Sequence, residues 1–171
     1  MTNEPAFRSE ALGEHHDLEG FRCGHDDLDA WLRNTARSAG AKNTGRTFVW
    51  VDRDDHVAAY YTLCAHVIVK DEVPRKWGRG DPDQIPATLL ARLALDTRHH
   101  GRGVGSALLS EALRRAVIAS AEVAARYVVV HAIDKTAEDF YRHHGFRDSE
   151  RPSQLLRKVS DIAADLTDGA R

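Results

Sequence analysis

The chain has 171 residues, of which 42% are hydrophobic and 29% charged, which is typical of one globular domain with its own core. The net charge of -2 excludes the overall basic field of many nucleic-acid-binding proteins, and no apolar stretch approaches the roughly 20 residues of a membrane-spanning helix. Two cysteines do not suggest a disulfide-stapled scaffold, and the first residues lack the pattern of a signal peptide, so we expect a cytoplasmic protein.

The first half of the chain predicts a short strand, an amphipathic helix, an antiparallel hairpin of two strands and a long loop. In chain order, these elements are expected at residues 7–14, 26–39, 47–51 with 57–69, and 70–84. Asp26 is the expected N-cap of the helix, and Asp29 three positions later gives the pattern of a capping box. The loop is long for a structureless connection, which usually indicates a functional role.

In the second half, strands alternate with helices, which predicts an α/β fold. The expected elements are a strand at 89–95, a turn at 96–103, a helix at 104–121, a strand at 127–132 and a helix at 135–143. Gly145 is expected to end the last of these helices. The tail predicts a final strand at 155–162, with a helix at 163–166 as an alternative for its end.

The turn at 96–103 has the composition of a phosphate-binding site. Gly101, Gly103 and Gly105 lie where a strand gives way to a helix, and Arg98 and Arg102 add positive charge. N–H groups at a helix N-terminus have no partner within the helix, and glycine lets a phosphate approach them closely. Neither a Walker motif nor Gly-x-Gly-x-x-Gly is present. We therefore expect a pyrophosphate ligand; a turn that serves geometry alone is the alternative.

About thirty residues after this turn, the chain reads Asp-Lys-Thr-Ala-Glu-Asp-Phe-Tyr-Arg-His-His-Gly-Phe at 134–146. In this order and at this spacing, the two segments resemble the GNAT acetyltransferases. The coenzyme A loop of that family reads Gln/Arg-x-x-Gly-x-Gly/Ala, and its later Phe-Tyr-x-x-x-Gly-Phe contains the catalytic tyrosine. The resemblance implies a single GNAT domain over 1–171, with a mixed, mostly antiparallel central sheet flanked by helices and a cofactor-binding core at about 89–146.

The resemblance also assigns residues to acetyl-CoA, the cofactor of the family. Two registers fit the loop: Arg98 with Gly101 and Gly103, or His100 with Gly103 and Gly105. We prefer the second, because the residues after Gly105 continue as the helix of the family does. The cofactor-binding residues so implied are Leu93, Ala94, Leu95, His100, Gly101, Arg102, Gly103, Val104, Gly105, Ser106 and Phe140.

Acyl transfer from a thioester needs a neutral amine, a stabilised oxyanion and a proton for the leaving thiolate. The phenol of Tyr141 is our candidate for the acid, with core packing as the alternative. Backbone N–H groups at 93–95 are expected to hold the thioester oxygen. No general base is evident, since Glu138 and Asp139 are expected to face solvent. An α-amine, with a pKa of about 7.7–8.0 against about 10.4 for lysine, needs less help from a base and is the favoured substrate.

Further segments resemble the GNAT toxins of bacterial toxin–antitoxin modules, namely residues 21–32, 45–49, 59–63 and 91–95. This resemblance implies an aminoacyl-tRNA substrate, blocked translation, a ribbon-helix-helix antitoxin as partner and a homodimer. The basic residues expected to contact tRNA are Arg33, Arg37, Arg46, Arg75, Lys76, Arg79 and Arg92.

Two other functions stay open. One is acetylation of a small amine or a protein N-terminus, and the other is a non-catalytic coenzyme A-binding module. Neither a metal nor a membrane is expected as a partner. The sequence contains no His-Glu-x-x-His or Cys-x-x-Cys with zinc-ligand spacing.

Overall fold

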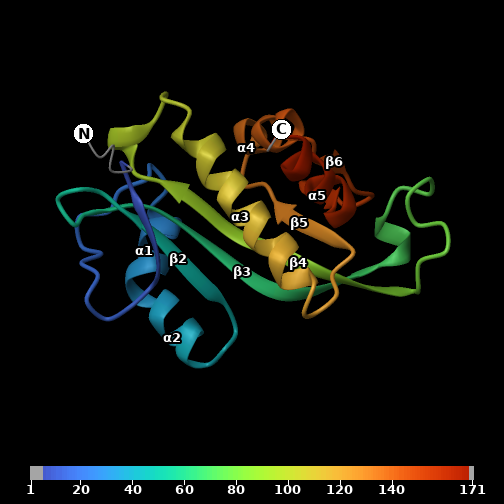
Figure 1. Cartoon of the computed structure of the whole chain (residues 1–171), viewed down its shortest axis with the longest axis horizontal. Coiled ribbons are helices and arrows are strands. Elements are labelled where there is room, and N and C mark those ends of the chain that lie inside the picture. Colours follow the sequence, from blue (N-terminus) through green and yellow to red (C-terminus); the bar gives the residue numbers. More distant parts are fainter. Residues whose placement is uncertain (1–5, 170–171) are drawn as a thin grey trace. The chain divides into compact units, whose positions relative to one another are not determined.

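The computed structural model describes residues 6–169 (Figure 1). In that range the strands are β1 (Arg8–Ala11), β2 (Arg46–Val51), β3 (Val57–Val69), β4 (Gln84–Leu95), β5 (Tyr127–His131), β6 (Arg147–Asp148) and β7 (Gln154–Lys158). They are hydrogen-bonded in the order β1-β2-β3-β4-β5-β7-β6. β4 and β5 run parallel, while the neighbouring pairs β1–β2, β2–β3, β5–β7 and β6–β7 are antiparallel. The predicted α/β fold with a mixed, mostly antiparallel sheet is therefore confirmed. The chain divides into two compact units, which are described separately below: residues up to Cys64 with Arg92–Leu109, and Ala65–Ala91 with the chain from Ser110 onward.

The first unit is built around the N-terminal strands and two short helices (Figure 1). Its elements are β1 (Arg8–Ala11), α1 (Asp26–Asn34), α2 (Ala36–Ala41), β2 (Arg46–Val51), the first part of β3 (Val57–Val69), the end of β4 (Gln84–Leu95), the 3-10 turn η2 (Thr97–His99) and the start of α3 (Val104–Ser120). The predicted β2–β3 hairpin is confirmed, with Val49 opposite Tyr60. Both side chains are fully buried and pack with Leu32 of α1 in the core of this unit.

The helix expected at 26–39 is in fact two helices. Thr35, with φ −126° and ψ −33°, leaves the helical conformation between α1 and α2, as its β-branched side chain allows. The N-cap is the extended residue His25 rather than Asp26, and it makes no side-chain capping bond. Asp29 does not complete a capping box: its buried carboxylate accepts a hydrogen bond from the N–H of Cys23 at 3.0 Å.

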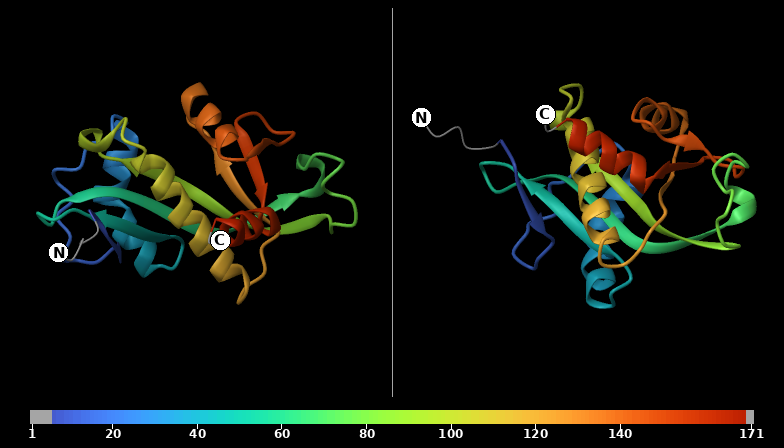
Figure 2. Two further views of the ribbon diagram at one scale, coloured as in Figure 1. Left: turned by 45° about the horizontal axis from the view of Figure 1, so that its top comes forward. Right: turned by 45° about the vertical axis from the view of Figure 1, so that its right-hand side comes forward.

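The second unit contains the C-terminal strands and their helices. Its elements are the remainders of β3, β4 and α3, the 3-10 turn η1 (Lys70–Glu72), β5 (Tyr127–His131), α4 (Lys135–His143), β6 (Arg147–Asp148), β7 (Gln154–Lys158) and α5 (Val159–Asp168). Figure 2 shows β5 and β7 side by side, with α5 following β7 directly. Ile85, Tyr127 and Leu156 are fully buried and form the centre of its apolar core. Among the described residues, no helix has the length and apolarity needed to cross a membrane.

Three strands differ from their predicted bounds by more than one residue, and the first of them, β1, covers Arg8–Ala11 rather than 7–14. β4 begins at Gln84 rather than 89, because Pro86 is accommodated in the strand: it has no N–H to satisfy, and its carbonyl accepts the N–H of Arg126 at 2.8 Å. The strand expected at 155–162 ends at Lys158, and α5 follows. Helical backbone lets α5 bury Ile162, which is 1% exposed, while Asp161 beside it stays exposed.

Candidate active site

A buried carboxylate organises the chain just before the glycine turn. Asp96 is 2% exposed, and its side chain accepts three hydrogen bonds: from Arg22 N at 3.1 Å, from Arg98 N at 3.0 Å and from Arg98 Nε at 2.8 Å. Burial acts to raise the pKa of Asp96, but these hydrogen bonds and the charge of Arg98 outweigh it and lower that pKa below the ordinary value. Asp96 is therefore ionised at neutral pH and holds the start of the turn.

The glycine turn has a backbone that requires glycine. Gly101 and Gly103 both have φ of +75°, in the left-handed region that other residues avoid. A Cβ built at either position would meet nothing within 4 Å, so the space beside this backbone is open. The carbonyl of Gly103 accepts the N–H of Ala107 at 3.3 Å as α3 begins, and Gly105 lies in the first turn of that helix. First-turn N–H groups next to open space form the geometry that binds a phosphate.

The side chains predicted around the turn have different surroundings. His100 Nε2 lies 2.7 Å from the carbonyl oxygen of Leu95, to which it donates. Arg98 is bonded to Asp96, as described above, and Arg102 is exposed. Ala94 is buried in the core of the first unit. The donors that the turn offers to a phosphate are consequently its backbone N–H groups and the exposed guanidinium of Arg102.

Apart from Phe140 on α4, the remaining predicted cofactor residues lie on the strand before the turn and at the start of α3. Leu93, Leu95, Val104, Gly105 and Ser106 are all partly buried. The side chains of Leu93 and Leu95 alone would indicate core packing, so any role of these two residues toward a cofactor belongs mainly to their backbone.

Tyr141 lies on α4, the helix predicted at 135–143, which Asp134 caps by accepting the N–H of Ala137 at 2.8 Å. Tyr141 is 8% exposed, and its ring packs edge-to-face against Phe140 and Phe146, each with ring centroids 5.4 Å away. Burial raises the pKa of its phenol well above the ordinary value of 10. The hydroxyl therefore carries its proton throughout the physiological pH range, as a general acid must.

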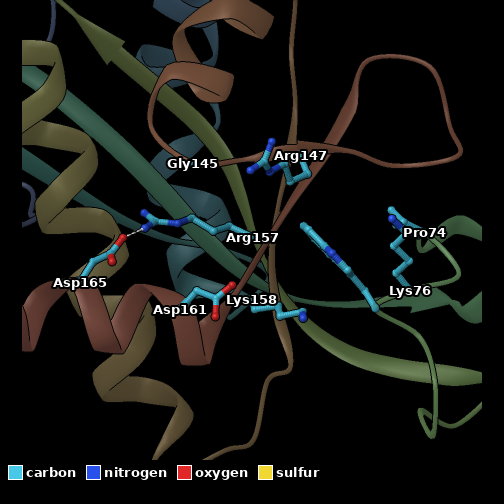
Figure 3. A pocket seen from close by; sticks show the side chains of 9 residues that line it. Pro74, Lys76, Gly145, Arg147, Arg157, Lys158, Asp161 and Asp165 are labelled. Carbon is cyan, nitrogen blue, oxygen red and sulfur yellow. Dashed lines mark hydrogen bonds and ion pairs between the residues drawn. The ribbon is translucent and has the colours of Figure 1, made fainter.

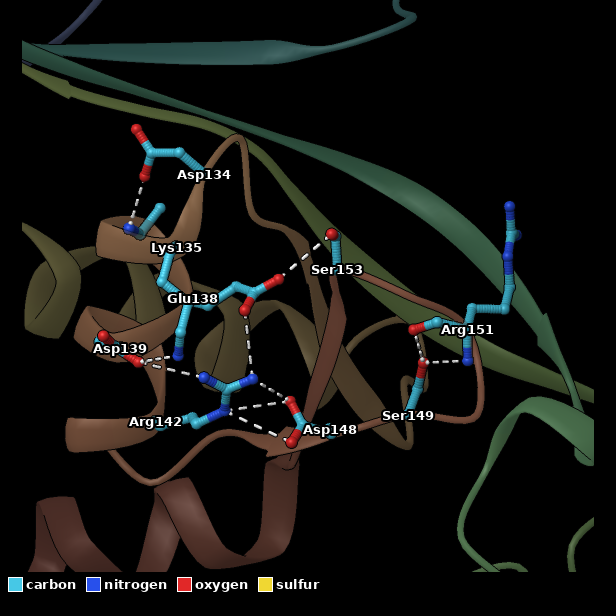
Figure 4. Close-up of polar contacts among 10 residues, drawn as sticks. Asp134, Lys135, Glu138, Asp139, Arg142, Asp148, Ser149, Arg151 and Ser153 are labelled. Atoms are coloured by element: carbon cyan, nitrogen blue, oxygen red, sulfur yellow. Dashed lines mark hydrogen bonds and ion pairs between the residues drawn. The ribbon is translucent and has the colours of Figure 1, made fainter.

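The two acids beside Tyr141 are engaged in ion pairs (Figure 4). Arg142 contacts Asp148 of β6 at 2.9 Å, Asp139 at 3.1 Å and Glu138 at 3.3 Å. Glu138 also accepts a hydrogen bond from Ser153 at 3.2 Å. These contacts attach α4 to the β6–β7 segment, and they leave neither Glu138 nor Asp139 as a free base.

The basic residues of the first unit are partly committed to its own structure. Arg37 donates to the carbonyl oxygens of Gly13 and His16, while Arg33 and Arg46 each reach a backbone carbonyl at 3.5 Å. Arg92 is half-buried, with its guanidinium carbon 3.8 Å from the centroid of the Trp31 ring. Burial lowers the pKa of Arg92, but far too little to remove its charge, so a cation stacked on an aromatic ring lies on β4.

The second unit contains a basic pocket of about 600 Å³ (Figure 3). It is lined by Pro74, Lys76, Trp77, Gly145, Arg147, Arg157, Lys158, Asp161 and Asp165. Arg157 pairs with Asp165, and Lys158 Nζ lies 5.1 Å from the centroid of the Trp77 ring. Four cations thus face two carboxylates, and the excess of positive charge suits an anionic ligand. Lys76 was predicted as a tRNA contact; its pocket neighbours on β6 and β7 were not, because they are distant in sequence.

Arg75 and Arg79, the other two predicted tRNA contacts of this loop, are exposed and do not line the pocket. They lie on the connection between η1 and β4, on either side of Lys76 and Trp77. Their side chains are therefore available to solvent on the same loop.

Two groups of possible metal ligands occur among the described residues, Glu10 with His15 and His16, and Asp52 with Asp54 and His56. In the first, Gly13 N donates to His16 Nδ1 at 2.9 Å, so Nε2 carries the proton and donates to Glu10 at 2.8 Å. In the second, Asp52 accepts the N–H groups of Asp54 and His56, both at 2.9 Å, in a tight turn. These hydrogen bonds account for both clusters without a metal.

The comparisons with known proteins agree with this fold. Residues 44–148 match the family model of the acetyltransferase (GNAT) domain, and the chain therefore belongs to the GNAT acetyltransferase family and is an N-acetyltransferase. It is 34% identical over 158 residues to a tRNA-acetylating toxin of Mycobacterium tuberculosis (strain ATCC 25618 / H37Rv), with 92% of this chain and 95% of the relative covered.

A second curated relative, a probable toxin TacT of Sinorhizobium fredii (strain NBRC 101917 / NGR234), is 27% identical, with 86% of each chain covered. Among solved structures, AtaT complexed with acetyl-methionyl-tRNAfMet is 25% identical, with a TM-score of 0.87 and with 94% of this chain and 99% of that chain covered. A tyrosine-to-phenylalanine mutant of KacT, at 24% identity, gives a TM-score of 0.89 over the same shares of the two chains, a likeness in fold. The predicted membership of the GNAT family and its fold are confirmed.

Proposed function

We propose that this chain is a toxin that transfers the acetyl group of acetyl-CoA to the α-amino group of aminoacyl-tRNA and so blocks translation. The observation that carries the proposal is the 34% identity, along 92% of the chain, to a tRNA-acetylating toxin. AtaT, 25% identical, has been solved with acetyl-methionyl-tRNAfMet, with acetyl-CoA and with the C-terminus of the antitoxin AtaR. On this basis the chain acts in the cytoplasm, where charged tRNA is found, as a homodimer neutralised by a small ribbon-helix-helix antitoxin.

The cofactor roles follow from the local geometry of the turn. Residues 1–171 act as one acetyltransferase domain, in which the N–H groups around Gly103 and Gly105 bind the pyrophosphate of the cofactor. The left-handed backbone and the open space beside Gly101 and Gly103 let an anionic group approach these N–H groups closely. Backbone N–H groups at 93–95 hold the thioester oxygen, and Phe140 lines the pantetheine channel. Acetyl-CoA supplies the activated acetyl group.

Tyr141 supplies the proton that the departing thiolate needs. Its phenol is buried and protonated at neutral pH. In water a phenol is a weaker acid than a thiol, by about 1.5 pKa units. A thiolate that forms in an equally dry environment is destabilised in the same way as the phenolate, so burial does not by itself make the transfer less favourable. Donation of the phenol proton to the sulfur during C–S cleavage then releases coenzyme A as the neutral thiol.

Two basic surfaces serve the RNA. The pocket lined by Lys76, Arg147, Arg157 and Lys158 offers an excess of positive charge to phosphates, and the exposed Arg75 and Arg79 extend it along the loop. Arg92, stacked on Trp31, offers a desolvated cation and an aromatic surface of the kind that RNA ends bind. Arg33, Arg37 and Arg46 contribute charge near α1 and α2, although Arg37 is chiefly structural.

The test is the transfer of radiolabelled acetyl from acetyl-CoA to a pool of total aminoacyl-tRNA, for the wild type and for Tyr141→Phe. Label that is released with N-acetylated amino acid when the tRNA ester is hydrolysed, and that is lost in the variant, is the expected result. Uncharged tRNA is the control and should stay unlabelled. If wild-type protein that binds coenzyme A leaves charged tRNA unlabelled, the toxin proposal is wrong and small amines become the substrates to test.

A further inference from the structure

The basic pocket of the second unit contains an aromatic ring, that of Trp77, beside its cations. Trp77 lies in the loop between η1 and β4 and packs against the buried core of this unit. Its ring is nearly parallel to that of Tyr127, with 11° between the planes and 6.3 Å between the centroids. Tyr127 is fully buried, and its hydroxyl donates to Asp81 of the same loop at 3.0 Å. The core therefore holds the indole in place, while the half-buried ring also lines the pocket.

One wall of the pocket is made by Arg157, which is not free to follow a ligand. Its side chain is 13% exposed and pairs with Asp165 of α5. Gly145 has φ of +87°, and a Cβ at this position would lie 3.0 Å from Arg157 Nε. The missing side chain of Gly145 thus leaves the room that the guanidinium occupies. Figure 3 shows Arg157 directed toward Asp165, whereas the ammonium of Lys158 points away from it.

Three further cations of the pocket have no carboxylate partner among residues 6–169, namely Lys76, Arg147 and Lys158. Lys158 Nζ instead lies over the Trp77 ring, 5.1 Å from its centroid. The remaining carboxylate of the pocket, Asp161, is in the first turn of α5, where the partial positive charge of the helix end favours it. Three cations consequently surround a fixed aromatic ring without a carboxylate that neutralises them.

This combination fits a nucleotide better than it fits a phosphate or an acidic peptide alone. Phosphate groups need only the cations, and the carboxylates of a peptide gain nothing from a flat ring. An unpaired nucleotide presents both a phosphate and a base that stacks on an aromatic side chain. In a duplex the base is already stacked on its neighbours, so the ring would stay unused. Lys158 has a long side chain, which lets its ammonium leave the indole for a phosphate when a base takes its place.

We propose that this pocket binds an unpaired nucleotide of the RNA substrate, whose base stacks on Trp77 while its phosphates contact Lys76, Arg147 and Lys158. The inference rests on the proposed RNA substrate and adds a contact to a base where charge alone would recognise only the backbone. Every base has a flat face, so the site selects unpaired RNA and not a particular sequence.

The experiment measures, by filter binding, the affinity of the full chain for two probes of equal charge. One is a single-stranded RNA of about 10 nucleotides with mixed sequence, and the other is a ribose-phosphate chain of the same length without bases. Trp77→Leu keeps an apolar side chain against Tyr127 but removes the stacking surface. We expect it to weaken binding of the RNA about 10-fold, within the range measured for the loss of one base–aromatic stack. Binding of the chain without bases should not change.

Two further variants and the salt dependence separate stacking from other effects. Trp77→Phe retains an aromatic ring and should keep most of the affinity. The matched control is Trp50→Leu, which removes a half-buried tryptophan of β2 that stacks on Phe7 at 5.5 Å, and it should leave RNA binding unchanged. Trp77→Leu removes no charge, so the slope of the binding constant against salt concentration, both as logarithms, should equal that of the wild type. If Trp77→Leu does not fold by circular dichroism, Trp77→Met takes its place.

Equal losses on both probes, or no loss on either, would overturn the nucleotide site. A polyglutamate peptide is the third probe. If Trp77→Leu weakens binding of this peptide but not of the RNA, the pocket serves an acidic protein segment and the proposal is wrong.

These binding measurements need neither acetyl-CoA nor acetyl transfer, so they are independent of the test of the toxin function. If charged tRNA stays unlabelled while the loss that depends on the bases is found, the toxin function is wrong and the nucleotide site is supported. If charged tRNA is acetylated and Trp77→Leu binds the RNA like the wild type, the nucleotide site alone is wrong. A wild-type chain that binds neither the RNA nor the chain without bases would refute the site as well.

Discussion

Asp96→Asn tests whether one buried carboxylate holds the entrance to the cofactor turn. Asparagine has the same shape, so Oδ1 keeps the two hydrogen bonds from the backbone and side chain of Arg98. The second oxygen, which accepts the N–H of Arg22 at 3.1 Å, becomes an NH2 group. Two donors then face each other at a site where the side chain is only 2% exposed.

The cost can be worked from these contacts. A buried donor left without an acceptor costs about 1–3 kcal/mol. Loss of the charge beside Arg98, whose side chain is 49% exposed, adds at most about 1 kcal/mol because solvent screens that pair. We therefore expect the free energy of unfolding to fall by about 2–3 kcal/mol, which for a chain of this length lowers Tm by about 4–12 °C. Affinity for coenzyme A should fall as well, because the turn begins at this residue.

Urea unfolding followed by circular dichroism measures the stability, and calorimetric titration with coenzyme A measures the affinity. The matched control is Asp139→Asn, which removes an exposed carboxylate that pairs with Lys135 and Arg142 and should leave the free energy of unfolding nearly unchanged, because solvent screens both pairs. A value for Asp96→Asn equal to that of the control would refute the structural role assigned to Asp96.

The difference between wild type and Asp96→Asn should also depend on pH in a defined direction. The pKa of Asp96 in the folded protein is lower than its ordinary value of 3.8. For a lowered carboxyl pKa, the stabilisation is complete above the unfolded value and is lost as the pH falls through the folded value. The difference should therefore be constant from about pH 5 to 8 and should shrink below about pH 4.

Three further results are expected. Tyr141→Phe should lower kcat by about 100-fold with little change in Tm. Because the pKa of the Tyr141 phenol is raised, the wild type should lose no activity through ionisation of this group below pH 10. A loss of activity that follows such an ionisation below pH 10 would contradict the assignment of Tyr141 as the acid. Gly103→Ala should lower the free energy of unfolding by about 1–2 kcal/mol, because Gly103 has a left-handed backbone, and it should weaken coenzyme A binding. The control Gly40→Ala, in helical α2, should do neither. Calorimetry measures both the stability and the coenzyme A affinity of the two variants. Arg147→Glu should weaken RNA binding in filter-binding assays. The slope of the binding constant against salt concentration, both as logarithms, should become shallower by about the amount expected for one phosphate contact. Arg114→Glu on α3, outside the pocket, should have neither effect.

Local sequence pattern was sufficient for most of the elements and for the phosphate-binding turn. The bounds of β3 and α4 agree with the predictions because both are set by short-range signals: alternating apolar residues with a turn before them, and an Asp134 cap with a glycine after the helix. The α1–α2 break and the β7–α5 junction were missed. At both places the same residues suit more than one backbone conformation, and contacts from elsewhere in the chain decide between them.

The sequence predicted which kinds of residue form the candidate site, but it did not predict the contacts that these residues make. Gly101 and Gly103 indicate the turn because glycine alone readily adopts φ of +75°, a property of single residues. That Arg37 is bound to backbone carbonyls and that Trp77 stacks on Tyr127 depends on pairings across dozens of residues. The spacing of apolar residues along the chain does not predict such pairings, because it indicates which face of a helix or strand is buried and not which side chain lies opposite that face.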